Sequence, residues 1–304
     1  MAVFTASPID PDQIREIIPL GNLNPAGGHV LPSDHIYLDY GRKPGLTVCA
    51  PAAGTITAVR DQLRGDSKVE IRVDENISYY LAHLDLEPGI AAASKVSRAQ
   101  KLGQASGKSM LDLGATDSRV GLSGFVNPDR YTQPTLHTIS PLSVFADPLR
   151  SQLYLKVNRK GAEKDGKIDL DEPGRLLGNW FHETLSVQDS SRGDPTVWAK
   201  QLAFGYDVHD PGAVRISIGG TIAPAGLYAL LPGAPDPAEV GVETGLVKYP
   251  LRLIGGDRTS RSEHSAGLRL VQLLNERQLK VEYLAEGSFV GVKGFTGNAS
   301  IYER

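Results

Sequence analysis

The sequence has little of several features that identify a class of protein directly. Cys49 is the one cysteine among 304 residues, so an internal disulfide is excluded and the redox compartment is left open. The formal net charge of -3 provides no excess of basic residues for nucleic acid or an anionic membrane. No run of residues approaches the roughly 20 apolar residues that a membrane-spanning helix needs. We therefore expect neither a nucleic-acid partner nor a membrane span.

The first 22 residues lack the apolar core of a secretory signal, because they hold three acidic residues and three prolines. We expect no signal peptide in the chain as given. The compartment is left open: the protein is cytoplasmic, or extracytoplasmic if a signal was trimmed.

Long helical periodicity is scarce as well. Only two short segments favour a helix, Pro11 to Ile18 and Pro195 to Leu202. Glycine (33) and proline (20) are scattered evenly, which is typical of many short strands joined by turns. Alternating or β-branched runs are frequent, and we predict a mainly β protein. These runs are 46–49, 54–59, 69–73, 78–83, 153–157, 214–218, 268–273 and 279–283.

A domain boundary is predicted where SPLSVFADPL places two prolines between two strand-rich halves. We therefore expect a first domain over residues 1–148 and a second over residues 149–304.

Polar residues gather in three segments of the first half. GGHVLPSDHIYLDYG contains His29, Asp34, His35 and Asp39. CAPAAGTITAV has the pattern of a strand, a turn and a second strand. SYYLAHLDLEPG places His83 at the end of an apolar strand, and KLGQASGKSMLDLGATD follows it.

These segments together resemble the lysostaphin-type (LytM-like) zinc metallopeptidase family, whose fold is the duplicated hybrid motif. His35 and Asp39 match its H-x-x-x-D motif, and residues 50–56 match A-P-x-x-G-x-V. Residues 80–84 match Y-x-x-H-L, and residues 102–107 match a reduced form of its glycine-rich stretch. The resemblance covers about residues 20–125. It implies an antiparallel β-sheet core domain.

The chain departs from the family at the last motif, where two histidines stand two residues apart on one strand. Here the sequence reads Met110-Leu111-Asp112-Leu113-Gly114. This alignment places Asp112 at the metal-ligand position and Met110 at the catalytic position. A thioether neither transfers a proton nor donates a strong hydrogen bond.

The resemblance implies His35, Asp39 and Asp112 as ligands of one divalent metal. One imidazole and two carboxylates suit zinc, and they shift the preference toward manganese or magnesium. On a regular strand His35 and Asp39 would lie about 13 Å apart, so the chain must turn between them. His29 and Asn24 are alternative ligands, and a buried polar pair is the alternative to a metal site.

His83 retains the family's role of hydrogen bonding to the transition state, and it is the candidate catalytic residue. Without a histidine at position 110, efficient hydrolysis is not expected, because a positioned acid–base group contributes a factor of about 10²–10⁴.

We therefore expect a non-hydrolytic, peptidase-like protein that binds a peptide or peptidoglycan. The alternative is a divergent metal-dependent hydrolase that uses His35, Asp39 and Asp112. A third interpretation is a phosphocarrier-like domain, which would need a second histidine beside His83. The oligomeric state is left open.

The second half is predicted to be an antiparallel β barrel or sandwich, with terminal strands over residues 268–283 and 295–302 closing the sheet. Its segment Gly178 to Phe181 resembles the G-N-W-F motif of β domains that follow such degenerate domains in exported bacterial proteins. Trp180, Phe181 and Trp198 are expected in its core, and His182 and His209 at its surface.

Overall fold

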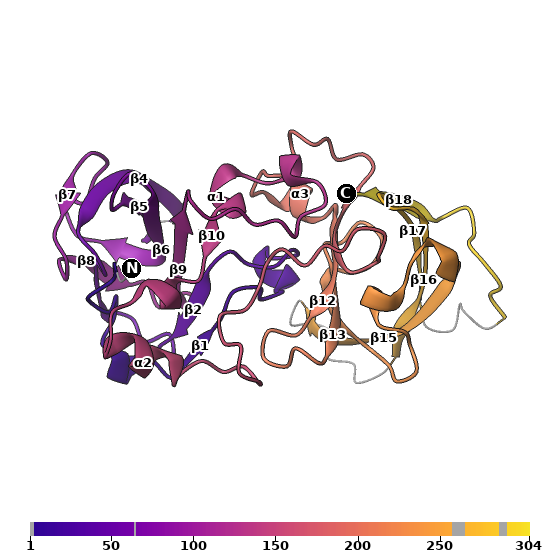
Figure 1. Ribbon diagram of the computed structural model, residues 1–304, viewed down its shortest axis with the longest axis horizontal. Helices are drawn as coiled ribbons and strands as arrows, with labels where there is room; N and C mark the ends of the chain where they lie inside the picture. The colour runs from indigo at the N-terminus through magenta and orange to yellow at the C-terminus, as the bar shows by residue number, and fades with distance from the viewer. Residues whose placement is uncertain (1–2, 64, 257–264, 286–290) are drawn as a thin grey trace. The chain divides into compact units, whose positions relative to one another are not determined.

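Two compact units make up the protein (Figure 1). The computed structural model describes residues 3–63, 65–256, 265–285 and 291–304. The sheet unit consists of Met1–Leu20, Asp34–Gly121 and Gln133–Gly166. The barrel unit consists of Gly21–Ser33, Leu122–Thr132 and Lys167–Arg304.

The units do not follow the single break that we expected between residues 148 and 149. The segment that follows this break returns to the first strand of the chain. Ile17 forms an isolated parallel bridge with Val157, and its amide donates to the Lys156 carbonyl at 2.8 Å. Residues up to 166 therefore group with the sheet unit, whereas residues 21–33 and 122–132 group with the barrel unit.

The sheet unit is built on a 10-stranded antiparallel sheet. Its main path runs in the order β1-β2-β9-β6-β5-β4-β7; β10 pairs with β9, and β8 pairs with β3 and β6. The strands are β1 (Glu16–Ile18), β2 (Ile36–Asp39), β3 (Thr47–Cys49), β4 (Gly54–Leu63), β5 (Asp66–Arg72), β6 (Ile77–Leu86), β7 (Lys95–Val96), β8 (Lys101–Ala105), β9 (Leu111–Asp117) and β10 (Thr138–Ile139). The helices are α1 (Gln133–Leu136), α2 (Leu149–Tyr154) and the 3-10 helices Pro11–Gln13 and Pro141–Val144.

The centre of this sheet is the strand β9, which lies between β2 and β6. Six of its seven residues are buried, including the polar Asp112 and Asp117. Its neighbour β6 alternates buried and partly exposed residues over most of its length, as expected for a strand with one face on the core. Polar side chains on β9 and β6 are therefore held in a largely dehydrated, fixed setting.

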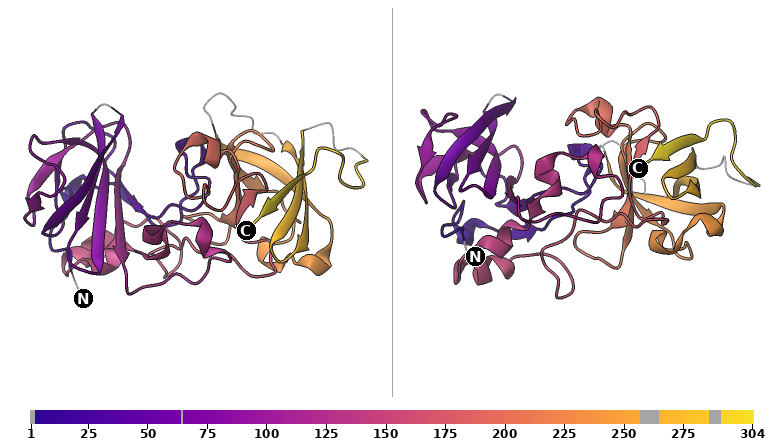
Figure 2. Two further views of the ribbon diagram at one scale, coloured as in Figure 1. Left: turned by 90° about the horizontal axis from the view of Figure 1, so that it is seen from above. Right: turned by 45° about the horizontal axis from the view of Figure 1, so that its top comes forward.

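The barrel unit is a closed antiparallel barrel in which each strand pairs with the next and β18 pairs with β11 (Figure 2). Its strands are β11 (Gly178–His182), β12 (Gln201–Tyr206), β13 (Val214–Ile218), β14 (Gly226–Leu230), β15 (Val247–Gly256), β16 (Ser265–Asn275), β17 (Gln278–Leu284) and β18 (Ser300–Glu303). The helices are α3 (Pro195–Trp198) and the 3-10 helices Pro25–Gly27, Pro128–Arg130, Pro237–Glu239 and Val242–Thr244. Trp180, Phe204 and Tyr249 are fully buried members of the core cluster in this unit.

The side chain of Arg304 binds the segment that precedes the first strand of the barrel. The guanidinium of Arg304 lies 4.1 Å from the ring of Trp180, and it donates to the Leu177 and Glu172 carbonyls at 2.8 Å each. It also donates to the Arg175 carbonyl. This one side chain therefore ties β18 to the start of β11.

The predicted fold class is confirmed: the protein is mainly β, with a sheet unit and a closed barrel. The burial of Trp180 and Phe181 is confirmed as well.

Two predicted elements were wrong. The run 153–157, predicted as a strand, lies partly in helix α2, where Leu153 is buried and the following Leu155 is 88% exposed. The predicted helix over 11–18 is a short 3-10 helix followed by β1, because Glu16–Ile18 pair with β2. Within the described ranges, no helix combines the length and apolar character needed to cross a membrane.

Gly114 on β9 makes room for the ring of Tyr80, its cross-strand partner on β6. A Cβ atom at Gly114 would lie 2.2 Å from Tyr80 Cε1. We predict that Gly114→Ala lowers the free energy of unfolding by about 1–3 kcal/mol, the usual cost of overpacking a buried site. Urea denaturation measures this change.

Gly121 is the control, since a Cβ there meets no atom within 4 Å and its φ is not positive. Gly121→Ala should change stability by less than about 0.5 kcal/mol. Equal effects of the two substitutions would contradict the packing argument.

Candidate functional site

His83 occupies an unusual backbone position in the middle of β6. Its φ is +72°, in the left-handed region that non-glycine residues rarely adopt. Ser67 on β5 is opposite Leu84, whereas the next residue, Lys68, is opposite Ala82, so His83 is the extra residue of a β-bulge. A bulge turns a side chain away from the regular alternation of the strand. Such backbone strain persists only where the surrounding structure holds it, and it is concentrated at functional sites.

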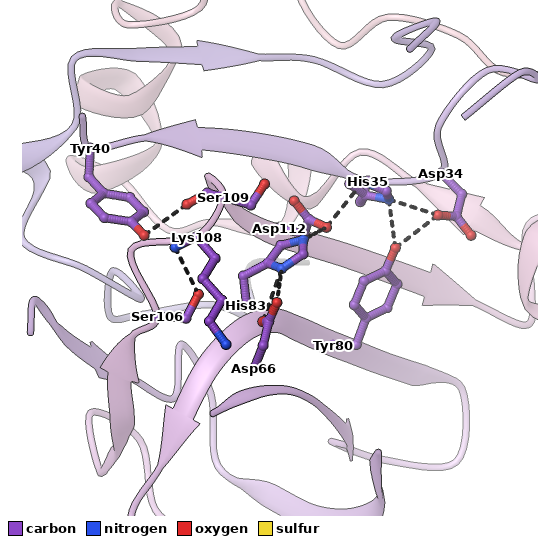
Figure 3. A network of polar contacts seen from close by, with 10 residues as sticks. All are labelled: Asp34, His35, Tyr40, Asp66, Tyr80, His83, Ser106, Lys108, Ser109 and Asp112. Carbon is purple, nitrogen blue, oxygen red and sulfur yellow. Dashed lines mark hydrogen bonds and ion pairs between the residues drawn. The ribbon is translucent and has the colours of Figure 1, made fainter. Parts of the chain in front are cut away.

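The imidazole of His83 lies between two carboxylates (Figure 3). Its Nδ1 atom is 3.1 Å from Asp66 Oδ1, and its Nε2 atom is 3.3 Å from Asp112 Oδ2. Asp66 begins β5 and is buried. The side chain of His83 is 21% exposed, so solvent or a ligand reaches it from one side.

His35 approaches the same carboxylate from the other direction (Figure 3). It immediately precedes β2, and its Nε2 atom is 3.4 Å from Asp112 Oδ2. Its Nδ1 atom is 3.0 Å from Asp34 Oδ1 and 2.8 Å from the Tyr80 hydroxyl. That hydroxyl also donates to Asp34 Oδ1 at 2.8 Å. A continuous polar network thus joins β2, β5, β6 and β9; its members are Asp34, His35, Asp66, Tyr80, His83 and Asp112.

The carboxylates raise the pKa values of both imidazoles. Burial lowers the pKa of His83, but its hydrogen bond and attraction to Asp112, together with those to Asp66, outweigh burial and raise it to about 9. Burial likewise lowers the pKa of His35, and attraction to Asp112 and the hydrogen bond to Asp34 raise it above its usual value. His83 is therefore protonated at neutral pH, and the setting of His35 favours its protonated form. A protonated imidazole has two donors and no lone pair for a metal or a proton.

The carboxylate at the centre of the network retains an unused acceptor. Asp112 Oδ1 is buried and has no hydrogen-bond partner in the part of the chain that the structure describes. A buried acceptor without a partner is uncommon. The network therefore uses both N–H groups of His83 on its own carboxylates and leaves one buried acceptor, Asp112 Oδ1, that no described residue uses.

Of the three predicted metal ligands, the structure brings together only His35 and Asp112. Asp39 is the last residue of the regular strand β2 and pairs with Glu16 on β1. Its carboxylate accepts a hydrogen bond from the Gly41 amide at 2.8 Å. The chain does not make the turn that a shared ion requires between residues 35 and 39. In the described residues, no group of three or more His, Cys, Asp or Glu side chains is arranged to hold a metal ion. The predicted ligand set thus does not fit a divalent metal, and metal binding stays a prediction.

The other candidate residues lie outside the network. His29 and Asn24 form a short antiparallel bridge in a loop that groups with the barrel unit. Met110 is partly buried and immediately precedes β9. Cys49 is partly buried on β3, and burial raises the pKa of its thiol.

Three members of the network were not predicted as site residues. Asp34 adjoins His35, and Tyr80 belongs to the Y-x-x-H-L match, so both had a signal in the sequence. Asp66 had none, because it lies 17 residues before His83 and reaches it only through the pairing of β5 with β6.

No family model and no curated protein matches the sequence. Among solved structures, Csd3 of Helicobacter pylori is similar at 16% identity and a TM-score of 0.34, over 48% of this chain and 34% of that one. A zinc-containing peptidase from Vibrio cholerae is similar at 21% identity and a TM-score of 0.31, over 37% of this chain and 36% of that one. A chain of the SpoIIQ–SpoIIIAH pore-forming complex is similar at 15% identity and a TM-score of 0.33, over 50% of this chain and 96% of that one.

The chain thus spans about a third of the length of Csd3 and of the Vibrio cholerae peptidase. At these identities and TM-scores, membership of the lysostaphin-type family stays a prediction.

The charged state of His83 predicts a pH-dependent stability. Its pKa is about 9 in the folded protein and 6.5 in an ordinary setting, so its contribution is complete below pH 6.5 and is lost as the pH rises through 9. The contribution is on the order of 1–3 kcal/mol, since each pKa unit corresponds to about 1.4 kcal/mol. We predict that His83→Asn removes more stability at pH 6 than at pH 10, as measured by urea denaturation. Asparagine suits this position because it tolerates a positive φ.

His137→Asn is the control, because His137 lies in the same unit and outside the network. A destabilisation by His83→Asn that is the same at both pH values would contradict the charged state.

Proposed function

We propose that the sheet unit is a peptidase-like module that binds a peptide or cell-wall-like ligand without hydrolysing it. The observation that carries this proposal is the position of Asp112 Oδ2, which lies 3.4 Å from His35 Nε2 and 3.3 Å from His83 Nε2. One carboxylate oxygen thereby engages both of the imidazoles that would serve catalysis.

The chemistry of the network supports binding over hydrolysis. Hydrolysis of a peptide needs a group that takes a proton from water, and a protonated imidazole does not accept one. At the position where the family resemblance implies a second catalytic group, the chain has Met110, which has no proton to transfer. The family mechanism therefore lacks its base.

The exposed side of the network supports contact with a polar ligand. The side chains of His83 and Asp34 are 21% and 35% exposed, whereas His35 and Asp112 are almost fully buried. A carbonyl of a ligand that approaches the exposed side of the ring would share an N–H group of the His83 imidazolium with Asp66 or Asp112, and hydrogen bonds from charged donors are stronger than neutral ones. Backbone strain is concentrated at functional sites, so the positive φ of His83 supports a functional role for its side chain. The peptide or cell-wall class of the ligand rests on the resemblance to the lysostaphin-type family.

A metal-dependent hydrolase is the second candidate function. It is favoured by the convergence of two imidazole Nε2 atoms on one carboxylate oxygen. With both rings neutral, His35, His83 and Asp112 would supply two nitrogens and one oxygen, a donor set whose chemistry suits zinc, but the side chains would have to rearrange, because no such group in the described residues is arranged to hold a metal ion. This set differs from the one predicted from the sequence, because it replaces Asp39 with His83.

Co-sedimentation with insoluble peptidoglycan tests the proposal. We predict that the full chain sediments with the sacculi and releases no soluble fragments, with or without added zinc or manganese. Substitution of His83 by alanine should weaken binding about tenfold or more, because it removes a charge-assisted donor worth roughly 1.5–3 kcal/mol. His137→Asn should bind like the unchanged protein.

Metal content, measured by mass spectrometry on the same samples, separates the two candidate functions. Release of fragments that requires near one equivalent of metal, and that is lost in Asp112→Asn, would overturn the proposal in favour of the hydrolase. Sedimentation that is absent, or that is unchanged by His83→Ala, would contradict a ligand site at this network.

A further inference from the structure

The interior of the barrel contains a buried charge that has no hydrogen-bond partner in the described ranges of the chain. Arg269 on β16 is 0% exposed. Its Nε, Nη1 and Nη2 atoms all lack a hydrogen-bond partner among the residues that the structure describes. A buried guanidinium is normally paired and fully hydrogen-bonded, because removing it from water without compensation is costly. The barrel's described side chains therefore leave the guanidinium of Arg269 without an acceptor.

The register of the barrel places Arg269 on the inner face. Arg269 is opposite Tyr249 on β15 and opposite Tyr283 on β17. Residues opposite one another on paired strands share a face, and Tyr249 belongs to the core cluster of this unit. Val271 and Leu273, two and four residues further along β16, belong to the same cluster. The guanidinium is thus surrounded by the apolar interior.

Tyrosine hydroxyls are buried in the same interior, and two of them lack a hydrogen-bond partner in the described part of the chain. The hydroxyls of Tyr249 and Tyr302 are buried and have no hydrogen-bond partner in the described part of the chain. The hydroxyl of Tyr228, in contrast, donates to the Pro224 carbonyl at 2.8 Å. Burial lowers the pKa of Arg269 to about 10, and the groups that oppose this effect are the tyrosines 302, 228 and 283. The interior therefore holds one positive charge and two hydroxyls whose hydrogen-bonding capacity is unused by the described residues.

These donors define the chemistry of the missing acceptor. A single guanidinium in an apolar setting balances one negative charge, so a monoanion is favoured over a dianion. A planar carboxylate matches the guanidinium through two parallel hydrogen bonds. The remaining lone pairs of the carboxylate would accept hydrogen bonds from tyrosine hydroxyls. Closed barrels of eight strands are wide enough to hold side chains or one small ligand.

The geometry points to a ligand site inside the barrel, in which Arg269 binds the carboxylate of a small monoanionic molecule and the hydroxyl of Tyr302 is a further donor. This site is separate from the polar network of the sheet unit, and it stands whether or not that network binds a peptide.

Thermal denaturation of the full chain tests this site, with tryptophan fluorescence as the signal. The protein is first unfolded in guanidinium chloride and refolded, and native mass spectrometry verifies that it is free of bound small molecules. Sodium acetate and sodium octanoate are then titrated at constant ionic strength. Sodium chloride and octanol are the matched anionic and neutral probes.

We predict a saturable rise in the melting temperature with at least one carboxylate, and no saturable rise with chloride or octanol. Arg269→Met should weaken the carboxylate response by tenfold or more. Without ligand the same substitution should raise the melting temperature, because it removes an uncompensated buried charge. Arg252→Met on the adjacent strand β15 is the control, since Arg252 is exposed and should respond like the unchanged protein.

Tyr302→Phe keeps the testing independent of whether Arg269→Met folds, because it removes only a hydroxyl; it should weaken the carboxylate response about threefold. No response to either carboxylate would overturn the proposal. A response equal for chloride and carboxylate, or equal in Arg269→Met and the unchanged protein, would overturn it as well. The proposal would also be overturned if Arg269→Met lowered the melting temperature by the same amount with and without carboxylate, because Arg269 would then have only a structural role.

Discussion

The contact of one carboxylate with two imidazoles is the constraint on which the sheet unit depends. Asp112 can lie between His35 and His83 only because β9 is inserted between β2 and β6 in the sheet. The bulge at His83 turns one imidazole toward Asp112, and the absence of a side chain at Gly114 leaves room for the ring of Tyr80, whose hydroxyl contacts the other imidazole. Each of them goes against the regular pattern of a strand, which is expected where a site sets the local geometry.

Protonation follows from the same arrangement. Carboxylates on both sides of each ring favour the imidazolium, and an imidazolium binds acceptors well but does not accept protons. The features that stabilise the network are thus the features that oppose hydrolysis. A ligand-binding module and a stable charged network are consistent with each other, whereas a metal centre that uses His83 would require its ring to lose a proton.

Alternation in the sequence predicted four of the ten strands of the sheet, β3 to β6, and the family resemblance implied three of the network's members, because alternation and motif spacing are local signals. His35, His83 and Asp112 were identified in this way, and they lie together. Asp39 was identified by the same spacing, but it lies at the other end of a regular strand. Asp66 could not be identified, since its distance to His83 depends on strand register rather than on sequence separation. Register is set by turns and bulges that a single sequence does not display.

The barrel shows the same limit of sequence reasoning. In LRLVQL, residues 268–273, simple alternation would place the leucines 268 and 270 inside and Arg269 outside. The structure places Arg269 opposite two tyrosines and on the face of Val271 and Leu273 instead. The contacts by which Arg304 ties β18 to the start of β11 could not be predicted from the sequence either, because their acceptors are backbone carbonyls more than 120 residues earlier.

The charge state of the two imidazoles is the most direct test of this account. Nitrogen NMR spectra of protein with ¹⁵N-labelled histidine distinguish neutral from protonated rings, and His35→Asn and His83→Asn variants assign the signals. At pH 7 we predict that both rings are protonated and that one equivalent of zinc leaves their signals unchanged. Neutral rings whose Nε2 signals shift on addition of zinc would contradict the account and would identify a metal centre.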